Sequence, residues 1–288
     1  MSWKDQLTLV ACLSIPLFGC GKKAETAVKA KPIGMAYISA GEYIMGSDTS
    51  YPEEKPQRRV TLPGFWIDTT EVTTKQFAKF VAATSYVTLA EREPSREQYP
   101  DADPTLLKPG SAVFTEGKSK TPLACWSYKP GVSWRDGKPD QPVVHVAYED
   151  ALAYAKWSNK DLPTEEEWEA AAGSGGKLYP WGDEERPDGK WRANVWQGEF
   201  PTKDTGADGF KGLAPTGSFP ANKFGLYDMA GNAWEWTKSD GPDGMKVTKG
   251  GSFLCARAVC HRYRPSAKQP VTPDTSTEHI GFRCVIRE

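Results

Sequence analysis

Short alternations of hydrophobic and polar positions begin near Met35 and predict strands. The segment "MAYISAGEYIMGS" predicts two short strands on either side of a turn at Ala40–Gly41. The segment "RRVTLPGFWIDTTEVT" predicts two more strand-like runs, which Pro63–Gly64 separates. The first part of the fold is therefore expected to consist of short β elements.

The apolar spacing becomes helical after these strands. Thr73 followed by Gln76 is a capping box, and Phe77 and Phe80 fall on one face of a helix expected near 74–84. This helix is the first of three that the pattern predicts.

Two further helices follow a predicted strand, "QPVVHV". In "AYEDALAYAKWSN" the residues Ala151, Tyr154 and Trp157 recur at helical spacing. In "LPTEEEWEAAAGSGG" Thr164 and Glu167 form a capping box, and the glycines end the helix.

The remaining segments have weaker patterns. Residues 91–141 are rich in Pro, Gly, Lys and Arg without periodicity, so they predict a long, partly ordered loop. Beyond the third helix, strand-like pieces alternate with turns such as "ADGF", "MAGN" and "GPDG". No internal repeat, dinucleotide-binding glycine pattern, P-loop or metalloprotease helix is present in the sequence. The predicted fold class is α+β, a single domain over 35–288 with much irregular structure.

Composition narrows the class of protein. With 39% hydrophobic residues and a net charge of −1, the chain does not resemble a solvated disordered protein, and bulk charge argues against nucleic-acid binding. Its 11 Trp, 27 Gly and 23 Pro predict a turn-rich fold whose core is filled by large aromatic side chains.

The N-terminus predicts an exported lipoprotein. The apolar run "LTLVACLSIPLF" is too short to span a bilayer as a mature helix, and "LFGC", ending at Cys20, resembles a bacterial lipobox. Residues 1–20 are then a signal peptide, Cys20 carries lipid, and the polar residues 21–34 form a tether. The protein would lie on the periplasmic side of the envelope or on the cell surface, with the lipid anchor as its only membrane contact. A plain secretory signal and a misassigned start are the alternatives.

Two of the mature cysteines, Cys255 and Cys260, stand five residues apart in "LCARAVCHRYR". On a helix this spacing turns the chain by about 500°, and on a strand it places the side chains on opposite faces. The sulfurs can therefore meet only if the segment folds back. Spacing alone favours a structural disulfide, and it leaves open a Cu(I) site or two unrelated thiols.

A zinc site is disfavoured, because zinc needs four ligands. The sequence holds only three histidines, His145, His261 and His279, and no second cysteine cluster. Oxidising conditions outside the cytoplasm permit disulfides, but the cysteine count dictates no pairing.

The order and spacing of motifs from about Met35 to Glu288 resemble those of the formylglycine-generating enzymes, also called sulfatase-modifying factors. The resemblance is carried by "LPTEEEWEAAAGSGG", "YPWGDE", "ANVWQGEFP", "GLYDMAGNAWEWT", "KGGSFLCARAVCHRYR" and "GFRC". It implies the fold of that family, which is related to the C-type lectin fold. "GNAWEW", "GGS" and "GFRC" are shared by a wider superfamily, whereas the cysteine pair is specific, and many non-catalytic relatives lack one or both cysteines.

The resemblance implies an oxidase. Such an enzyme converts the cysteine of a Cys-x-Pro-x-Arg sequence in an unfolded sulfatase polypeptide to Cα-formylglycine, using copper and molecular oxygen. Cys255 and Cys260 match the two catalytic cysteines that hold Cu(I), and Ser252 matches the active-site serine. Trp234 is the candidate for a tryptophan near the active site; it alternates with Trp236, so one of the two would pack inside while the other lines a groove.

The resemblance also implies two structural calcium sites, with Gly231 and Ala233 acting through backbone oxygens. Carboxylates and carbonyls in tight turns suit such a hard cation, and without the resemblance these turns would be interpreted as solvated loops. The two predicted ligand sets are Asn194, Val195, Asp208 and Phe210, and Asp228, Gly231, Ala233 and Glu235.

Disulfides that some relatives carry are absent here, since Ala155, Ala172 and Pro265 stand at the matching positions. Cys284 could then pair with Cys125 or remain a buried thiol. A rival hypothesis is a lipid-anchored binding or scaffold protein that kept the fold, with Cys255–Cys260 as a mere disulfide. An iron sulfoxide synthase of the ergothioneine type would need an added histidine-rich helical domain, which three histidines cannot supply. The sequence does not indicate the oligomeric state.

Overall fold

Strands from the beginning and the end of the described chain pair in one sheet. The computed structural model describes residues 32–288, where β1 (Met35–Ile38), β4 (Phe65–Asp68) and β13 (Val285–Arg287) form an antiparallel sheet in the order β1-β4-β13. The predicted signal peptide, the lipidated Cys20 and most of the predicted tether lie outside the described residues.

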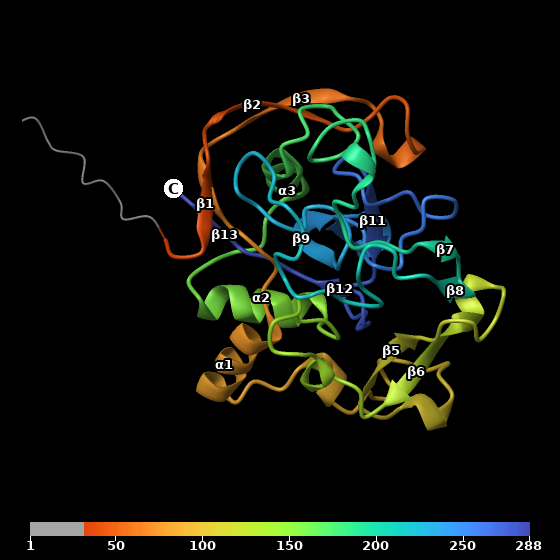
Figure 1. Ribbon diagram of the computed structural model, residues 1–288. Helices are drawn as coiled ribbons and strands as arrows, with labels where there is room; N and C mark the ends of the chain where they lie inside the picture. Colours follow the sequence, from red (N-terminus) through yellow and green to blue (C-terminus); the bar gives the residue numbers. More distant parts are fainter. Residues whose placement is uncertain (1–31) are drawn as a thin grey trace, which may run out of the picture. The chain divides into compact units, whose positions relative to one another are not determined.

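A second sheet of mixed direction lies at the centre of the fold (Figure 1). Its strands, in order, are β11 (Lys268–Val271), β10 (Lys246–Lys249), β9 (Trp234–Asp240) and β12 (Ile280–Gly281), with β12 parallel to β9. The cysteine loop follows β10 directly, so this sheet anchors the candidate site.

Three hairpins complete the strands. They pair β2 (Gly41–Met45) with β3 (Arg58–Leu62), β5 (Gly110–Phe114) with β6 (Trp126–Pro130), and β7 (Gly198–Glu199) with β8 (Lys203–Asp204). Single 3₁₀ turns connect the elements; they are η1 (Pro52–Glu54), η2 (Leu89–Glu91), η3 (Pro104–Leu106), η4 (Pro122–Cys125), η5 (Trp134–Asp136), η6 (Pro187–Gly189) and η7 (Pro242–Gly244).

All three predicted helices are confirmed: α1 (Thr74–Thr84), α2 (Tyr148–Trp157) and α3 (Glu165–Ala172). The capping box of α1 forms as expected, since the Thr73 hydroxyl accepts the Gln76 N–H at 3.2 Å. Such caps satisfy helix-terminal N–H groups that would otherwise lack partners. In Figure 1, α1 and α2 lie together on one side of the fold, away from α3.

Two predictions of secondary structure are wrong. "QPVVHV" forms only an isolated bridge, Pro142 with Thr73, because His145 adopts a left-handed φ of 59° that interrupts an extended run. Residues 91–141 are not a mere loop, since they contain the β5–β6 hairpin and several 3₁₀ turns.

Large aromatic side chains fill the core, as the composition predicts. Phe77 packs on Trp134, Tyr154 and Phe282 with ring centroids 5.2, 5.9 and 6.3 Å apart. Packing of this kind ties α1 and α2 to the strand segments near the C-terminal end of the described chain.

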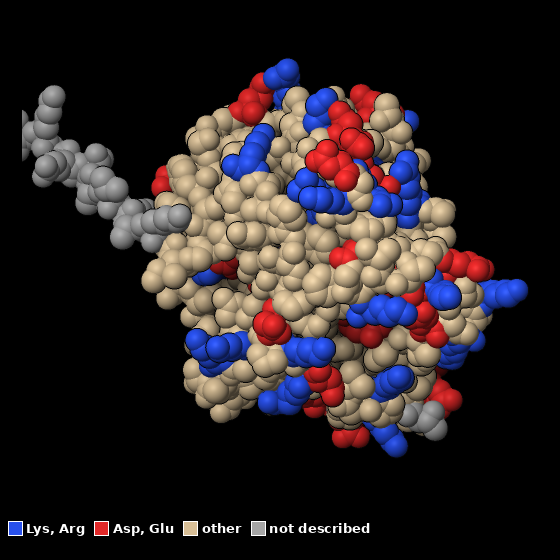
Figure 2. Space-filling model, viewed as in Figure 1, with Lys and Arg blue, Asp and Glu red and all other residues tan. Residues whose placement is uncertain are grey.

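The described residues form one compact unit, which confirms the single α+β domain. Acidic and basic side chains are interspersed on the face shown in Figure 2, consistent with the near-zero net charge. Among residues 32–288, no helix has both the length and the apolarity needed to cross a membrane.

Candidate active site

The loop that carries the cysteine pair folds back because of two glycines after β10. Gly250 and Gly251 have φ values of +95° and +75°, which favour glycine. A Cβ on Gly251 would lie 2.7 Å from the Cα of Tyr263, and a Cβ on Gly250 would lie 3.1 Å from the Trp168 ring. The close backbone approach of Gly251 to Tyr263 closes the loop between them, which brings its cysteines together.

Tight turns inside the loop set the positions of the two sulfurs. The Cys255 N–H donates to the Ser252 carbonyl at 2.9 Å, and the Cys260 N–H donates to the Ala256 carbonyl at 2.7 Å. Cys255 Sγ and Cys260 Sγ lie 3.4 Å apart, and both are free thiols in this structure. The expectation that the segment must fold back for the sulfurs to meet is therefore confirmed.

The two thiols differ in acidity. The pKa of Cys260 lies at about 6, below its ordinary value of 9.0, because the Cys255 thiol donates a hydrogen bond to it and because Arg262 lies close. Hydrogen bonding to Cys260 and burial raise the pKa of Cys255, which is 2% exposed. At neutral pH the pair therefore consists of a buried thiol donating to a partly exposed thiolate.

Only one of the three nearby arginines acts on the thiolate. Arg262 faces Cys260 and also pairs with Glu53 at 2.6 Å. Arg264 is buried in an ion pair with Glu54, and Arg257 is exposed. Arg262 is thus the residue that contributes positive charge to the site.

Ser252 and Trp234, the other two predicted site residues, are both buried. Ser252 is buried, its hydroxyl accepts the Leu254 N–H at 3.3 Å, and it lowers the pKa of the adjacent Cys255. Trp234 belongs to the same buried cluster as Cys255 and is 2% exposed. Trp236 is also buried, so the expectation that one of these two indoles lines a groove is wrong for this structure. The two residues stand two apart in β9 and therefore share one face of the strand, which packs into a single buried cluster.

Aromatic side chains that sequence reasoning missed, Tyr179 and Tyr263, belong to the same buried cluster as Cys255. His261 Nε2 lies 2.7 Å from the Tyr179 hydroxyl, and the Tyr263 ring packs against both rings. The Tyr263 hydroxyl donates to the Glu185 carboxylate. Their closeness to Cys260 in the sequence was the signal by which His261 and Tyr263 could have been recognised as site residues.

Two open cavities flank the cysteine loop. The loop cavity, about 450 Å³, is lined by Glu185, Trp191, Trp196, Gln197, Gly198, Glu199, Phe200, Ala256, Arg257, Ala258, Val259 and Tyr263. The acidic cavity, about 380 Å³, is lined by Phe114, Glu116, Asp136, Gly137, Gln141, Val144, His145, Trp196, Asp204, Lys211, Gly212, Leu213, Phe253, Leu254 and Glu278. Trp196 lines both cavities, and its backbone N–H donates to the Cys255 carbonyl at 3.2 Å. Trp196 therefore separates the two cavities and is tied to the backbone of the cysteine loop.

The acidic cavity carries an excess of negative side chains. Glu116, Asp136, Asp204 and Glu278 line it together with a single cation, Lys211. Among the described residues none of these carboxylates has an ion-pair partner within 4.0 Å, because the ion pairs of residues 32–288 all join other groups. Burial raises the pKa of Glu278 to about 7. The cavity is suited to a cationic side chain.

The first predicted calcium set comes together around one amide. Gln197 Nε2 donates to the Val195 carbonyl and, at 2.7 Å, to Asp208 Oδ2. The Asn194 amide nitrogen donates to the Gly212 carbonyl at 2.9 Å and to Asn232 Oδ1 at 3.0 Å. The Val195 carbonyl and Asp208 Oδ2 thus meet at Gln197 Nε2, a position that fits a cation. The Phe210 N–H, not its carbonyl, faces Asp208 in this structure.

The second predicted set includes a buried ion pair. Glu235 accepts from Arg283 Nε and Nη2, both at 2.7 Å, and from Trp168. Gly231 and Ala233 lie in the same turn region, where a Cβ on Gly231 would clash with the Asn194 carbonyl at 2.2 Å.

Near this pair lies an acid that sequence reasoning missed. Glu71 is fully buried, one of its oxygens has no hydrogen-bond partner among residues 32–288, and burial together with Asp228 raises its pKa. Glu71, Asp228 and Glu235 thus face the single guanidinium of Arg283, so a further cation fits the charge of this region. Within residues 32–288 no three His, Cys, Asp or Glu side chains already converge as metal ligands, so backbone oxygens and water would complete either site.

Comparison with known proteins agrees with this geometry. The family model described as "Sulfatase-modifying factor enzyme 1-like domain" matches residues 22–288. The chain belongs to the sulfatase-modifying factor family. The resemblance seen in the motifs is therefore confirmed.

Some curated relatives in the sulfatase-modifying factor family are named as active enzymes and others as inactive ones. The "Formylglycine-generating enzyme" of Mycobacterium tuberculosis is 43% identical over 286 residues, covering 86% of this chain and 96% of the relative. The "Inactive C-alpha-formylglycine-generating enzyme 2" of Mus musculus is 40% identical over 265 residues, covering 87% of this chain and 84% of the relative. Overall identity alone does not distinguish an active member from an inactive one, so the residues of the site must.

A solved structure supports the fold of this sulfatase-modifying factor. PvdO from Pseudomonas aeruginosa superposes with a TM-score of 0.64 at 22% identity, over 88% of this chain and 94% of that one. At this identity the likeness supports the architecture and not the chemistry.

The dithiol fits the copper that the family resemblance implies. Soft thiolate sulfurs suit Cu(I), and Cys260 is already deprotonated near neutral pH. The other two mature thiols take no part. Cys125 and Cys284 are buried and free, which agrees with the buried-thiol alternative for Cys284.

Proposed function

We propose that this protein oxidises the cysteine of a Cys-x-Pro-x-Arg sequence in an unfolded sulfatase polypeptide to Cα-formylglycine. The observation that carries the proposal is the Cys255–Cys260 dithiol, with sulfurs 3.4 Å apart and one of them acidic. It occurs in a family whose relatives include several formylglycine-generating enzymes.

The reaction must balance. The substrate Cβ loses a hydrogen and its bond to sulfur, gains a carbonyl oxygen, and releases the sulfur as hydrogen sulfide. This is a two-electron oxidation, whereas reducing molecular oxygen to water takes four electrons. A thiol reductant therefore supplies the other two electrons.

Copper(I) is the proposed cofactor, held by Cys255 and Cys260. When bound, it supplies the activation of molecular oxygen that thiols alone do not provide. The chain's own residues prepare the ligands: Arg262 and the Cys255 hydrogen bond keep Cys260 deprotonated, while burial shields Cys255 from solvent. Ser252 lies against Cys255, where its hydroxyl can hydrogen-bond to the reacting sulfur.

The acidic cavity is the proposed subsite for the arginine of the substrate motif. Its four carboxylates have no ion-pair partner among the described residues, and a guanidinium presents a matching charge and donor array. The loop cavity offers apolar surface next to the thiolate, including Val259, which is 52% exposed. Trp196, whose buried Nε1 has no acceptor, lies between the two. An extended peptide can therefore place its cysteine at the pair and its arginine in the acidic cavity.

Calcium is the proposed structural cation at both predicted sites. Converging oxygens of Val195 and Asp208 support the first site, and the partnerless oxygen of Glu71 supports the second. The cations would hold the turns beneath the cysteine loop, since Asn194 and Gly231 bring the two sites side by side.

Lipid anchorage at Cys20 and export across the inner membrane are proposed from the lipobox alone. An unfolded sulfatase emerging from a secretion channel would present the extended peptide that this site needs. Metabolic labelling with palmitate tests the anchor, and the Cys20→Ala variant should lose the label and the membrane association.

The decisive experiment incubates the reduced, copper-loaded protein with a peptide containing Cys-Thr-Pro-Ser-Arg and follows the peptide mass. Loss of sulfur with gain of a hydrazide-reactive aldehyde is expected, and it should require copper. Cys255→Ser and Cys260→Ser should abolish it, whereas the matched control Cys125→Ser should retain it because Cys125 lies outside the pair. An unchanged peptide with folded wild-type protein would favour the scaffold hypothesis.

A further inference from the structure

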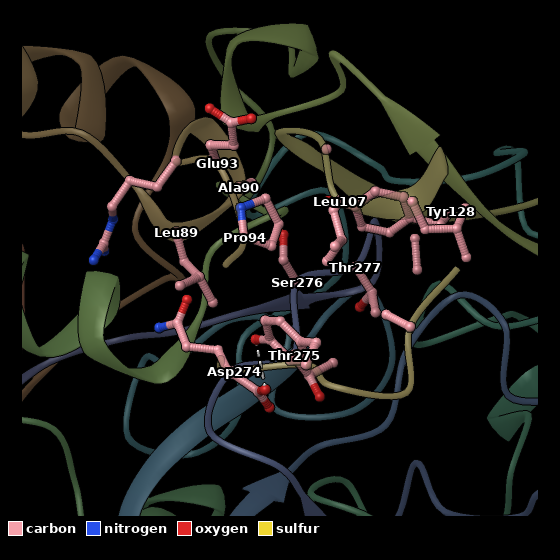
Figure 3. A pocket seen from close by; sticks show the side chains of 17 residues that line it. Leu89, Ala90, Glu93, Pro94, Leu107, Tyr128, Asp274, Thr275, Ser276 and Thr277 are labelled. Atoms are coloured by element: carbon pink, nitrogen blue, oxygen red, sulfur yellow. Dashed lines mark hydrogen bonds between the residues drawn. The ribbon is translucent and has the colours of Figure 1, made fainter. Parts of the chain in front are cut away.

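A third cavity lies apart from the cysteine loop, between residues 89–107 and residues 274–277 (Figure 3). Its volume is about 450 Å³, in the range of a pocket that binds a ligand or a few side chains. We name it the leucine cavity; its main apolar lining residues are Leu89, Pro94, Tyr99, Leu106, Leu107 and Tyr128.

The walls of the leucine cavity are held open by hydrogen bonds. The Tyr99 hydroxyl donates to Asp274 Oδ2 at 2.9 Å, which joins the two segments that face each other in Figure 3. The Tyr128 hydroxyl donates to the Lys108 carbonyl at 2.7 Å. Leu106 remains 45% exposed at the rim. An apolar pocket that is already formed avoids an ordering cost when it binds.

Strand β5 connects the leucine cavity with the acidic cavity. Gly110 and Ala112 line the leucine cavity, and Phe114 lines the acidic cavity. Every second residue of a strand lies on the same face, so these three residues share one face, with Ala112 and Phe114 about 7 Å apart. The two cavities therefore follow one another along β5.

The same path continues to the cysteine pair. The Phe114 and Trp196 ring centroids are 5.9 Å apart, and the Trp196 backbone N–H donates to the Cys255 carbonyl. Cysteine loop, acidic cavity and leucine cavity thus lie in this order. Since consecutive residues of an extended chain are about 3.3–3.6 Å apart, each cavity on this path corresponds to a few residues of a bound peptide.

A peptide on this path would have to bind through its side chains. One edge of β5 pairs with β6. At the other edge the Ala112 N–H donates to the Ser276 carbonyl at 3.0 Å, and the Ala112 carbonyl accepts the Glu278 N–H at 3.3 Å. Since both edges are occupied, strand addition is excluded, and insertion of a side chain into the cavity is the available mode.

We propose that the leucine cavity binds an apolar side chain of the same substrate polypeptide, about two to four residues after the motif arginine. The inference rests on the proposed function. If the cysteine lies at the pair and the arginine four residues later lies in the acidic cavity, the following residues continue along β5. The enzyme then recognises a longer stretch of the unfolded sulfatase than the five-residue motif.

Three peptides test the inference with the full-length protein. All share the Cys-x-Pro-x-Arg core; one adds a C-terminal extension with leucines, one adds a C-terminal extension with serines, and one adds leucines before the cysteine. The KM for the C-terminal leucine peptide should be at least about tenfold lower than for the serine peptide, since burial of one leucine side chain suffices for that ratio. The kcat should be equal.

Variants of the cavity provide the matched comparison. Leu106→Asp charges the rim, and Ala102→Trp fills the space, so each should remove the leucine advantage and leave the KM of the serine peptide unchanged. Leu123→Asp is the control, because Leu123 is 81% exposed and outside the cavity, and it should keep the advantage. Melting temperatures show that each variant folds.

Binding of fluorescent peptides to the copper-free protein separates this inference from the proposed function. Equal KM values for the two C-terminal extensions, with oxidation intact, would overturn the leucine cavity as a subsite. Preference for the peptide extended before the cysteine would overturn the direction of binding. If no peptide is oxidised while Leu106→Asp still weakens binding of the leucine peptide, the cavity is supported and the proposed oxidation is wrong.

Discussion

The proposed site depends on the low pKa of Cys260, and substituting each neighbouring group separately should change that pKa. Two groups stabilise the Cys260 thiolate: first the hydrogen bond from the Cys255 thiol, then the charge and hydrogen bond of Arg262. Arg262→Met removes the cation and keeps the length of the side chain. Cys255→Ala removes the hydrogen bond, whereas Cys255→Ser retains an O–H donor.

The expected magnitude follows from the pKa. With a pKa of about 6, about 90% of Cys260 is thiolate at pH 7, whereas at its ordinary value of 9.0 about 1% would be thiolate. Each variant removes part of this stabilisation, so each midpoint should rise above that of the wild type. Cys255→Ala should raise it most because it removes the larger cause, and Cys255→Ser should raise it less than Cys255→Ala.

Alkylation of Cys260 by iodoacetamide, measured against pH, gives the midpoint, because the thiolate is the nucleophile. Mass spectrometry of the Cys260 peptide excludes signals from other thiols. Arg257→Met is the control: Arg257 is exposed and pairs with Glu185, so the midpoint should not move. A wild-type midpoint near 9, or identical midpoints in wild type, Arg262→Met and Cys255→Ala, would refute the assignment of Cys260 as the stabilised thiolate.

Three further outcomes are expected. Arg283→Met leaves the buried Glu235 without its cation and should cost about 3–5 kcal/mol in urea unfolding, whereas loss of the exposed Arg59 should cost less than about 1 kcal/mol. Chelation of calcium should lower the melting temperature, and Asp208→Asn, which alters only the first cation site, should make this decrease smaller. Burial lowers the pKa of His279 to about 3, so the unfolded chain binds its proton first and stability should fall as pH drops from about 6.5 toward 3. His279→Gln should reduce the pH dependence of the urea midpoint, and the remainder should include His145, whose pKa burial lowers to about 4.

Helices were predictable because their signals are local. The capping boxes at Thr73 and Thr164 and the apolar faces behind them lie within one or two turns of the chain. The β5–β6 hairpin was not predictable in this way, because β5 obtains one of its edges from residues near Ser276, far away in the sequence. The left-handed backbone of His145 likewise has no local signal in "QPVVHV".

The candidate site likewise contains residues with a local sequence signal and residues that only folding brings together. The pair of cysteines and the glycines that close their loop lie within one short motif, so the sequence could indicate them. The cavities could not be found in this way, since Phe114, Trp196 and Glu278 come from three distant segments and meet only in the folded chain. Glu71 was missed for the same reason: its partner Asn232 and its neighbour Asp228 lie more than 150 residues away, as the spacing of 161 between Glu71 and Asn232 shows.

The residues that the fold requires differ from the residues that the proposed reaction requires, and Gly251 is an example of the first kind. Gly251 is required because the backbone of Tyr263 lies where a Cβ would be, which makes it a condition for the loop and not for the reaction. The architecture tolerates wide sequence change, since PvdO shares it at 22% identity. What the cysteines add is an acidic sulfur beside a buried one, in a loop whose neighbouring residues line two cavities. Activity in this family should therefore follow the dithiol and its arginine, while stability should follow the glycines and the buried ion pairs beneath them.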